Sequence, residues 1–245
     1  MMGKVVYCKM NIKIFKTPKQ VSDELSSYII SNYILSKKNI AISGGSTPIM
    51  LFEEISKKLK KKEKIESNFY WIDERCVLPD SKESNFKTAN DYLFKKIKID
   101  KKNIYRIKGE NNPDNEQKRY TELLENNLES INKLPSIDLS VLGIGNDGHT
   151  ASIFPYQMKK FIDCNSCFVG THPVSKQKRI SLSQNIINNS SEIIFHVTGK
   201  NKSDVVDEII NERGGYKLYP ASYIKPSFGK LSWYLDFDAA ENLTK

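Results

Sequence analysis

Residues 39–59, NIAISGGSTPIMLFEEISKKL, contain the pattern that decides the fold. Residues 39–43 are a compact apolar run of strand length, and the glycines that follow allow a tight turn. Leu51, Ile55 and Leu59 then recur at intervals of four, which places their side chains on one face of a helix. The stretch therefore predicts a strand, a turn and a helix in succession.

The same order recurs along the rest of the chain. A capping box, with Thr17 before Pro18 and Gln20, predicts the start of a helix. Short extended runs indicate peripheral strands at residues 5–8 and 12–15. Apolar patterns predict further strands at residues 69–73, 104–107, 137–145 and 192–199, and further helices near residues 89–97, 120–131 and 205–210. This alternation predicts an α/β fold, with a mostly parallel central sheet, helices on both faces and a few peripheral strands.

Length and composition limit the class of protein. With 245 residues, of which 39% are hydrophobic, the chain can bury a substantial core, and we expect a single domain over residues 1–245. No apolar run reaches the roughly 18 residues of a membrane span, and the first residues lack the apolar region of a signal peptide. We therefore expect a cytoplasmic protein with no membrane partner.

The charge balance favours a small anionic ligand. The chain has 38 Lys+Arg against 29 Asp+Glu, a net charge of +9, and positive charge concentrates anions near a protein surface. The lysines lie in short runs such as residues 56–64, which continue an amphipathic helix, so we expect no nucleic-acid partner. Cys164 and Cys167 have the spacing of a redox motif or of half a zinc site, but no second pair completes a metal site. We expect inert thiols in a reducing compartment.

Ligands of open α/β sheets bind beyond the carboxyl ends of the strands, so the residues that follow each predicted strand are candidate site residues. After the first of these strands, Thr47 can cap a helix that begins at Pro48, and N–H groups at a helix N-terminus attract phosphate. A plain helix-starting turn has the same pattern. The candidate phosphate-binding residues of this turn are Ser43, Gly44, Gly45, Ser46 and Thr47.

Further candidate site residues, one carboxylate and three cations, lie at other turns of the chain. Asp73 and Arg75 follow the apolar run FYWI. They either form a solvated loop, or Arg75 binds phosphate oxygens while Asp73 orients a sugar hydroxyl or a histidine. Lys202 precedes a helix that Ser203 could cap, where it either adds charge to an anion site or is simply exposed. Arg179, after a loop, offers another cation.

The junction GIGNDGHTASIFP, residues 143–155, carries the best candidate base. Asp147 and His149 lie two positions apart in a glycine-rich turn. Of the other histidines, His196 lies inside an apolar strand, where we expect a hydrogen-bonded structural imidazole, and His172 has a loop position. A neutral imidazole can take a proton from water near neutral pH. The alternative is that His149 only closes the loop by hydrogen bonds.

Together these segments resemble the 6-phosphogluconolactonase family, in the wider group that includes glucosamine-6-phosphate isomerase. The resemblance extends in order over nearly the whole chain through SGGSTP, DERCVLPDSKESN, GIGNDGHTASIFP, RISL, VTGKNK and YPASYIKP…LSWYLD. It implies a Rossmann-like fold of the isomerase/lactonase type. It also implies hydrolysis of 6-phospho-D-glucono-1,5-lactone to 6-phospho-D-gluconate in the oxidative pentose phosphate pathway, without metal or cofactor. The partner would be a small phosphorylated sugar lactone, bound by a monomer or a small homo-oligomer.

The resemblance also implies roles for particular residues. His149 would be the general base that activates water, with Asp147 and Asp73 supporting or orienting it. Other residues would hold the phosphate and line the sugar pocket: Ser43, Gly44, Gly45, Ser46, Thr47, Arg75, Lys202 and Arg179. Arg179 lies in the sequence RIS, at a position where the family more commonly has RIT.

Two differences separate the chain from the related isomerases. They carry an acidic residue five positions after the matching histidine, where this chain has Phe154, and they read DEY where this chain reads DER. Both differences favour the lactonase. Two alternatives stay open: a glucosamine-6-phosphate isomerase or deaminase, and a non-catalytic sugar-phosphate-binding module.

Overall fold

A seven-stranded sheet forms the centre of the protein, in the strand order β1-β14-β13-β10-β2-β4-β7. The computed structural model describes residues 10–59, 63–158 and 164–243. Every pair of neighbouring strands is parallel. The strands are β1 (Met10–Phe15), β14 (Lys230–Asp236), β13 (Glu192–Val197), β10 (Leu139–Leu142), β2 (Asn39–Ile42), β4 (Asn68–Trp71) and β7 (Ile104–Tyr105).

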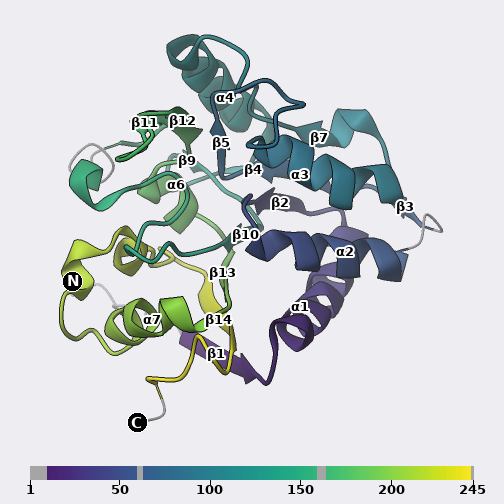
Figure 1. Cartoon of the computed structure of the whole chain (residues 1–245). Helices are drawn as coiled ribbons and strands as arrows, with labels where there is room; N and C mark the ends of the chain where they lie inside the picture. Colours follow the sequence, from purple (N-terminus) through teal and green to yellow (C-terminus); the bar gives the residue numbers. More distant parts are fainter. Residues whose placement is uncertain (1–9, 60–62, 159–163, 244–245) are drawn as a thin grey trace, which may run out of the picture.

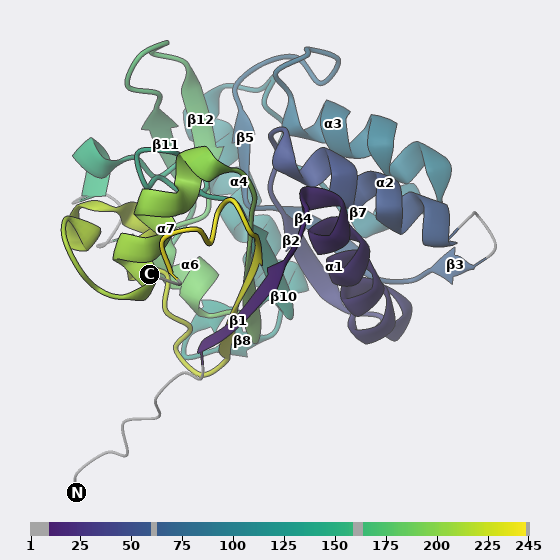
Figure 2. The same cartoon turned by 60° about the horizontal axis from the view of Figure 1, so that its bottom comes forward.

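Helices lie on both sides of this sheet (Figure 1). One side carries α1 (Pro18–Asn32), α2 (Thr47–Leu59) and α3 (Asn85–Tyr92), and the other carries α6 (Gln184–Asn188) and α7 (Ser203–Ile210). Figure 2 shows the same separation after a turn of 60°. Helix α4 (Pro113–Asn127) is tied to β4 through Tyr120, whose hydroxyl accepts the Trp71 N–H at 2.7 Å. The predicted α/β fold is therefore confirmed.

The apolar patterns explain the central elements. All residues of β10 and β13 are buried, as expected for parallel strands covered on both faces. In α2 the predicted stripe of Leu51, Ile55 and Leu59 is buried. The predicted cap of α1 is also present, because the Thr17 hydroxyl accepts the Gln20 N–H.

A smaller antiparallel sheet adjoins the end of β4. Its strands are β11 (Phe168–Thr171), β12 (Lys178–Ser181) and β5 (Asp73–Arg75), and Ile72 alone separates β4 from β5. The interpretation of DER as a solvated loop is therefore wrong: Asp73 and Glu74 are buried in a strand. Strands of three or four residues, as here, are too short for a periodic signal.

Several boundaries differ from those predicted. The helix expected near residues 89–97 begins at Asn85, because the Ser84 hydroxyl caps it, and ends at Tyr92. Strand β14 was not predicted, since a continuous apolar run can be a strand or a buried helix. Residues 12–15 lie in β1 at the edge of the central sheet, whereas residues 5–8 lie outside the described residues.

Short elements complete the chain. Two-stranded pairs are formed by β3 (Lys64–Ile65) with β6 (Lys98–Ile99) and by β8 (Ser130–Ile131) with β9 (Leu134–Pro135). Single 3-10 turns are η1 (Ile34–Ser36), η2 (Phe94–Lys96), η3 (Lys101–Asn103), η4 (Pro155–Gln157), η5 (Lys200–Lys202), η6 (Tyr216–Leu218) and η7 (Pro220–Tyr223). No helix within the described ranges has the length and apolar character needed to cross a bilayer.

Candidate active site

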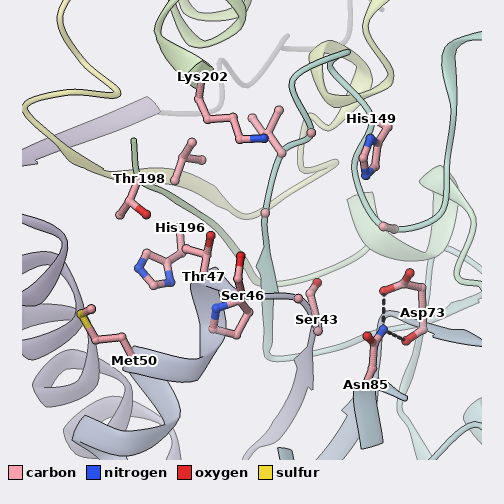
Figure 3. Close-up of a pocket in the computed structure, with 18 of the residues that line it drawn as sticks. Ser43, Ser46, Thr47, Met50, Asp73, Asn85, His149, His196, Thr198 and Lys202 are labelled. Atoms are coloured by element: carbon pink, nitrogen blue, oxygen red, sulfur yellow. Dashed lines mark hydrogen bonds between the residues drawn. The ribbon is translucent and has the colours of Figure 1, made fainter. Parts of the chain in front are cut away.

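A cavity of about 470 Å³ lies at the carboxyl ends of β2, β4, β10 and β13 (Figure 3). This is the position that the topology of an open parallel sheet favours for a ligand. The predicted residues that line it are Ser43, Gly44, Gly45, Ser46, Thr47, Asp73, Arg75, His149, Arg179 and Lys202. Asp147 is not part of the lining, but it contacts His149 from behind. The structure thus brings together residues that are far apart in the sequence.

His149 and Asp147 form a close pair. His149 Nδ1 lies 2.6 Å from Asp147 Oδ1, and the His149 backbone N–H also donates to that oxygen. This hydrogen bond is the main cause that lowers the pKa of Asp147 to about 2, so the carboxylate is ionised at neutral pH. With the Nδ1 proton donated to Asp147, Nε2 is left as an acceptor.

Glycine is required where this pair packs against the backbone. A Cβ on Gly145 would lie 2.0 Å from His149 Nδ1 and 2.6 Å from Asp147 Oδ1. Gly148 has a φ of +76°, a conformation that side chains with a Cβ rarely adopt. The glycines of the turn therefore let the imidazole lie directly on the chain.

Asp73 is buried and has its own partners. Its carboxylate accepts hydrogen bonds from the Ser152 hydroxyl at 2.5 Å and from the Asn85 side chain at 3.3 Å. Among the described residues, none of its hydrogen bonds goes to His149. Asp73 therefore does not orient the imidazole by direct contact, in contrast to one of its expected roles. Figure 3 shows Asp73 joined to Asn85 at the cavity wall.

Glu74 is a buried residue that the sequence did not indicate as part of the site. Its carboxylate accepts the backbone N–H groups of Arg75, Asn85 and Phe86 at 2.7–2.8 Å, and the Ser84 hydroxyl at 3.1 Å. Burial raises the pKa of Glu74 to about 7, while these N–H donors act in the opposite direction. Glu74 thus fixes the start of α3 against β5.

Asn85 also lines the cavity and was not among the predicted site residues. The local sequence signal for it is Ser84, a helix-capping residue directly before it.

The turn after β2 brings backbone N–H groups to the cavity. The Ser43 hydroxyl donates to the Val141 carbonyl at 2.9 Å, which ties the turn to β10. A Cβ on Gly44 would lie 1.9 Å from Asn85 Oδ1, and Gly45 has a φ of +101°. Helix α2 begins at Thr47 rather than at Pro48, and the first N–H groups of a helix have no partner within it. The turn can therefore donate to an anion.

Arg75 and Arg179 lie opposite one another on β5 and β12. The Nε atoms of both are buried and have no hydrogen-bond partner among the residues that the structure describes, although Arg75 Nη1 donates to the Glu83 carbonyl. Burial, and then the charge of Arg75, lower the pKa of Arg179. Two like charges held side by side favour the binding of an anion between them.

Lys202 adds a third cation to the cavity wall. Its ammonium group donates to the side-chain oxygen of Asn146, and burial lowers its pKa. Ser203 is the first residue of α7 and not its cap, since Lys202 occupies the cap position, where its side chain makes no capping hydrogen bond to the helix. None of the ion pairs in the described part of the chain involves Arg75, Arg179 or Lys202. The positive charge at the cavity is therefore not paired with carboxylates.

Phe154 packs against the imidazole of His149 and the guanidinium group of Arg179. Its side chain is fully buried, with its ring 5.0 Å from the His149 ring and 5.6 Å from the guanidinium carbon of Arg179. The apolar ring of Phe154 therefore lies against both the imidazole and the cation. Phenylalanine carries no carboxylate, unlike the acidic residue that the related isomerases have at this position.

The other histidines differ from each other. His172 lies between β11 and β12, a loop position as predicted, and its Nδ1 accepts hydrogen bonds from the N–H groups of Val174 and Ser175.

The prediction that the His196 ring is hydrogen-bonded is wrong. Within the described residues neither of its ring nitrogens has a partner. The ring is 3% exposed, and burial lowers its pKa to about 4. His196 also lines the cavity.

The described residues contain no group of three or more His, Cys, Asp or Glu that could hold a metal ion. Cys76, Cys164 and Cys167 are free thiols, and burial raises the pKa of Cys167 to about 12. A thiol with such a high pKa is a poor nucleophile and a poor metal ligand.

Comparisons with known proteins agree with this arrangement. Residues 17–233 match the family model described as glucosamine-6-phosphate isomerases/6-phosphogluconolactonase. A 6-phosphogluconolactonase of Haemophilus influenzae is 37% identical over 93% of this chain and 97% of its own length. The crystal structure of the devB protein superposes with a TM-score of 0.88 at 37% identity, covering 96% of this chain and all of that chain. A 6-phosphogluconolactonase structure from Trypanosoma brucei gives 0.82 at 28% identity, covering 96% of this chain and 99% of its own. This chain is a member of the glucosamine-6-phosphate isomerase/6-phosphogluconolactonase family.

Proposed function

We propose that this protein hydrolyses 6-phospho-D-glucono-1,5-lactone to 6-phospho-D-gluconate, a step of the oxidative pentose phosphate pathway. The observation that carries the proposal is the pairing of His149 with Asp147 at a cavity whose cations, Arg75, Arg179 and Lys202, form no ion pair with any carboxylate of the described residues. A phosphorylated lactone needs both features, a base for water and positive charge for the phosphate. The relatives named 6-phosphogluconolactonase support the same activity.

His149 is the general base of the proposed reaction. Its Nε2 takes a proton from water while the water oxygen forms a bond with C1 of the lactone. Asp147 holds the ring through Nδ1 and stabilises the imidazolium that forms. The bond between C1 and the ring oxygen then breaks, and the ring oxygen takes the proton from His149. The carboxylic acid of the product ionises and releases one proton.

The cations and the turn after β2 bind and stabilise negative charge. In the proposed reaction, Arg75, Arg179 and Lys202, with the N–H groups of residues 43–47, hold the phosphate and face the oxyanion that forms at C1; their common place in the cavity lining supports these roles. Phosphate binding fixes the ring against His149, so binding energy remote from C1 contributes to the rate. Asp73 orients the substrate, a role supported by the hydrogen bonds from Ser152 and Asn85 that hold its carboxylate at the cavity. The free thiols Cys76, Cys164 and Cys167 support a reducing, cytoplasmic location.

A proton-release assay on freshly generated 6-phosphogluconolactone tests the proposal. We expect the protein to accelerate proton release well above spontaneous hydrolysis and to release no ammonia from glucosamine 6-phosphate. Ammonia release would instead indicate the isomerase or deaminase activity. Binding of 6-phosphogluconate without either reaction would indicate a non-catalytic binding module.

A further inference from the structure

His196 has no role in the chemistry proposed above, yet it lines the same cavity. The ring lies at the carboxyl end of β13, is 3% exposed, and has no partner at either nitrogen within the described residues. A buried polar group without a hydrogen bond is destabilising and rare, so it calls for an explanation. A ligand that occupies the cavity could supply the missing partner.

The cavity has two chemically different parts. Asp73, Arg75, His149, Arg179 and Lys202 form the charged part of its lining. Figure 3 shows His196 near Met50, Thr47 and Thr198, with Lys202 between Thr198 and His149. The uncharged lining residues Pro18, Ser22, Met50, His196 and Thr198 are called the distal lobe.

We propose that the distal lobe binds the hydroxyl-bearing edge of the sugar and that His196 exchanges hydrogen bonds with one of its hydroxyls. This inference rests on the proposed function. A neutral imidazole has one donor and one acceptor, and a hydroxyl likewise both donates and accepts, so the two are complementary. A phosphate dianion only accepts, and the unpaired cations of the charged part already suit it.

The shape of the lactone agrees with this placement. In a 1,5-lactone, C1 and the carbon that bears the phosphorylated arm both adjoin the ring oxygen. The carbonyl and the phosphate therefore lie on one edge of the ring, and the hydroxyls of C2, C3 and C4 lie on the opposite edge. With the carbonyl at His149, and the phosphate at the cations and the turn after β2, the hydroxyl edge is the part of the ring that is left to contact Asp73 and the distal lobe.

Access to the imidazole requires a small local movement, because His196 is almost fully covered. Met50 lines the same cavity, and 37% of its surface is exposed. A methionine side chain is unbranched and changes rotamer readily, so the cavity wall can adjust without movement of the backbone.

The test compares ligand binding with and without the imidazole. The protein labelled with ¹⁵N-histidine is titrated with 6-phosphogluconate and, separately, with inorganic phosphate, and dissociation constants are measured for wild type, His196→Phe and His196→Gln. We expect the His196 ring signals to shift with 6-phosphogluconate and not with phosphate. His196→Phe should weaken 6-phosphogluconate about tenfold, the equivalent of one neutral hydrogen bond, and leave phosphate affinity unchanged. His196→Gln, which keeps a donor and an acceptor, should recover part of the loss.

Three results would overturn the inference. The first is 6-phosphogluconate binding that is unaffected by His196→Phe, and the second is wild-type His196 signals that do not move on titration. The third is an equal loss of affinity for phosphate and 6-phosphogluconate, which would place the phosphate at His196. His172→Gln serves as the matched control, because His172 does not line the cavity. Since these are binding measurements, absence of lactone hydrolysis would refute the proposed function while the role of His196 is still decided.

Discussion

Acidification should destabilise the protein through one buried side chain, His196. Its pKa is about 4 in the folded protein against an ordinary value of 6.5, because burial disfavours the charged ring. Between these two values the unfolded chain binds a proton that the folded protein does not. The free energy of unfolding therefore falls as the pH drops from 6.5 toward 4, and this loss is absent above 6.5.

The size of this effect follows from the difference between the two pKa values. At about 1.4 kcal/mol per pKa unit, full titration of His196 corresponds to about 3 kcal/mol. For a chain of this length, such a loss lowers the melting temperature by roughly 6–12 °C. Other groups also titrate in this range, so the effect must be measured as a difference between wild type and a variant that lacks the imidazole.

Urea unfolding of wild type and His196→Phe, measured between about pH 7.5 and pH 4, isolates the contribution. Wild type should lose about 3 kcal/mol more than the variant over this range. Phenylalanine is close in size and does not titrate, so the variant should retain the packing of β13. Parallel stability curves for the two proteins would refute the reasoning, because they would mean that the imidazole is charged as easily in the folded protein as in the unfolded chain.

Four further substitutions test the site. His149→Ala should retain binding of 6-phosphogluconate but lower kcat about 10²- to 10⁴-fold in the proton-release assay, and wild-type turnover would exclude a base role. Arg75→Ala should raise KM more than it lowers kcat, about tenfold or more, and an unchanged KM would contradict its role in substrate capture. Gly44→Ala should lower both melting temperature and activity, because its Cβ would lie 1.9 Å from Asn85 Oδ1; normal values for both would argue against this clash. Glu74→Gln should cost about 1–3 kcal/mol in urea unfolding, since it removes an acceptor for buried N–H groups, and unaltered stability would show that they find other acceptors.

Much of the central sheet could be predicted from the sequence, because buried parallel strands are continuous apolar runs and glycine follows β2, β10 and β13. Residues 39–59 fold as the pattern indicates. The small sheet could not be predicted in this way. Strand β5 pairs with β12, which lies about 100 residues further along the chain, and such pairing leaves no local periodic signal.

The candidate site was predicted unevenly for a related reason. Residues next to glycine turns, such as His149 and Gly44, carry a local signature. Glu74 and Asn85 act through burial and through hydrogen bonds to distant backbone, and His196 is distinctive only because its nitrogens have no partner among the described residues. These are properties of the packed protein, and for these three residues the only local cue is the capping Ser84 before Asn85.

The position of β14 has a consequence for biosynthesis. Met10 at one edge of the main sheet pairs with Leu231, and β14 is the only link in the described sheet between β1 and β13. While the chain is still on the ribosome, the earlier strands can pair with one another but β1 has no neighbour. Final closure of the sheet must therefore wait until residues 230–236 have been synthesised, so the nascent protein depends on the exposed, unpaired β1 staying free of aggregation until then.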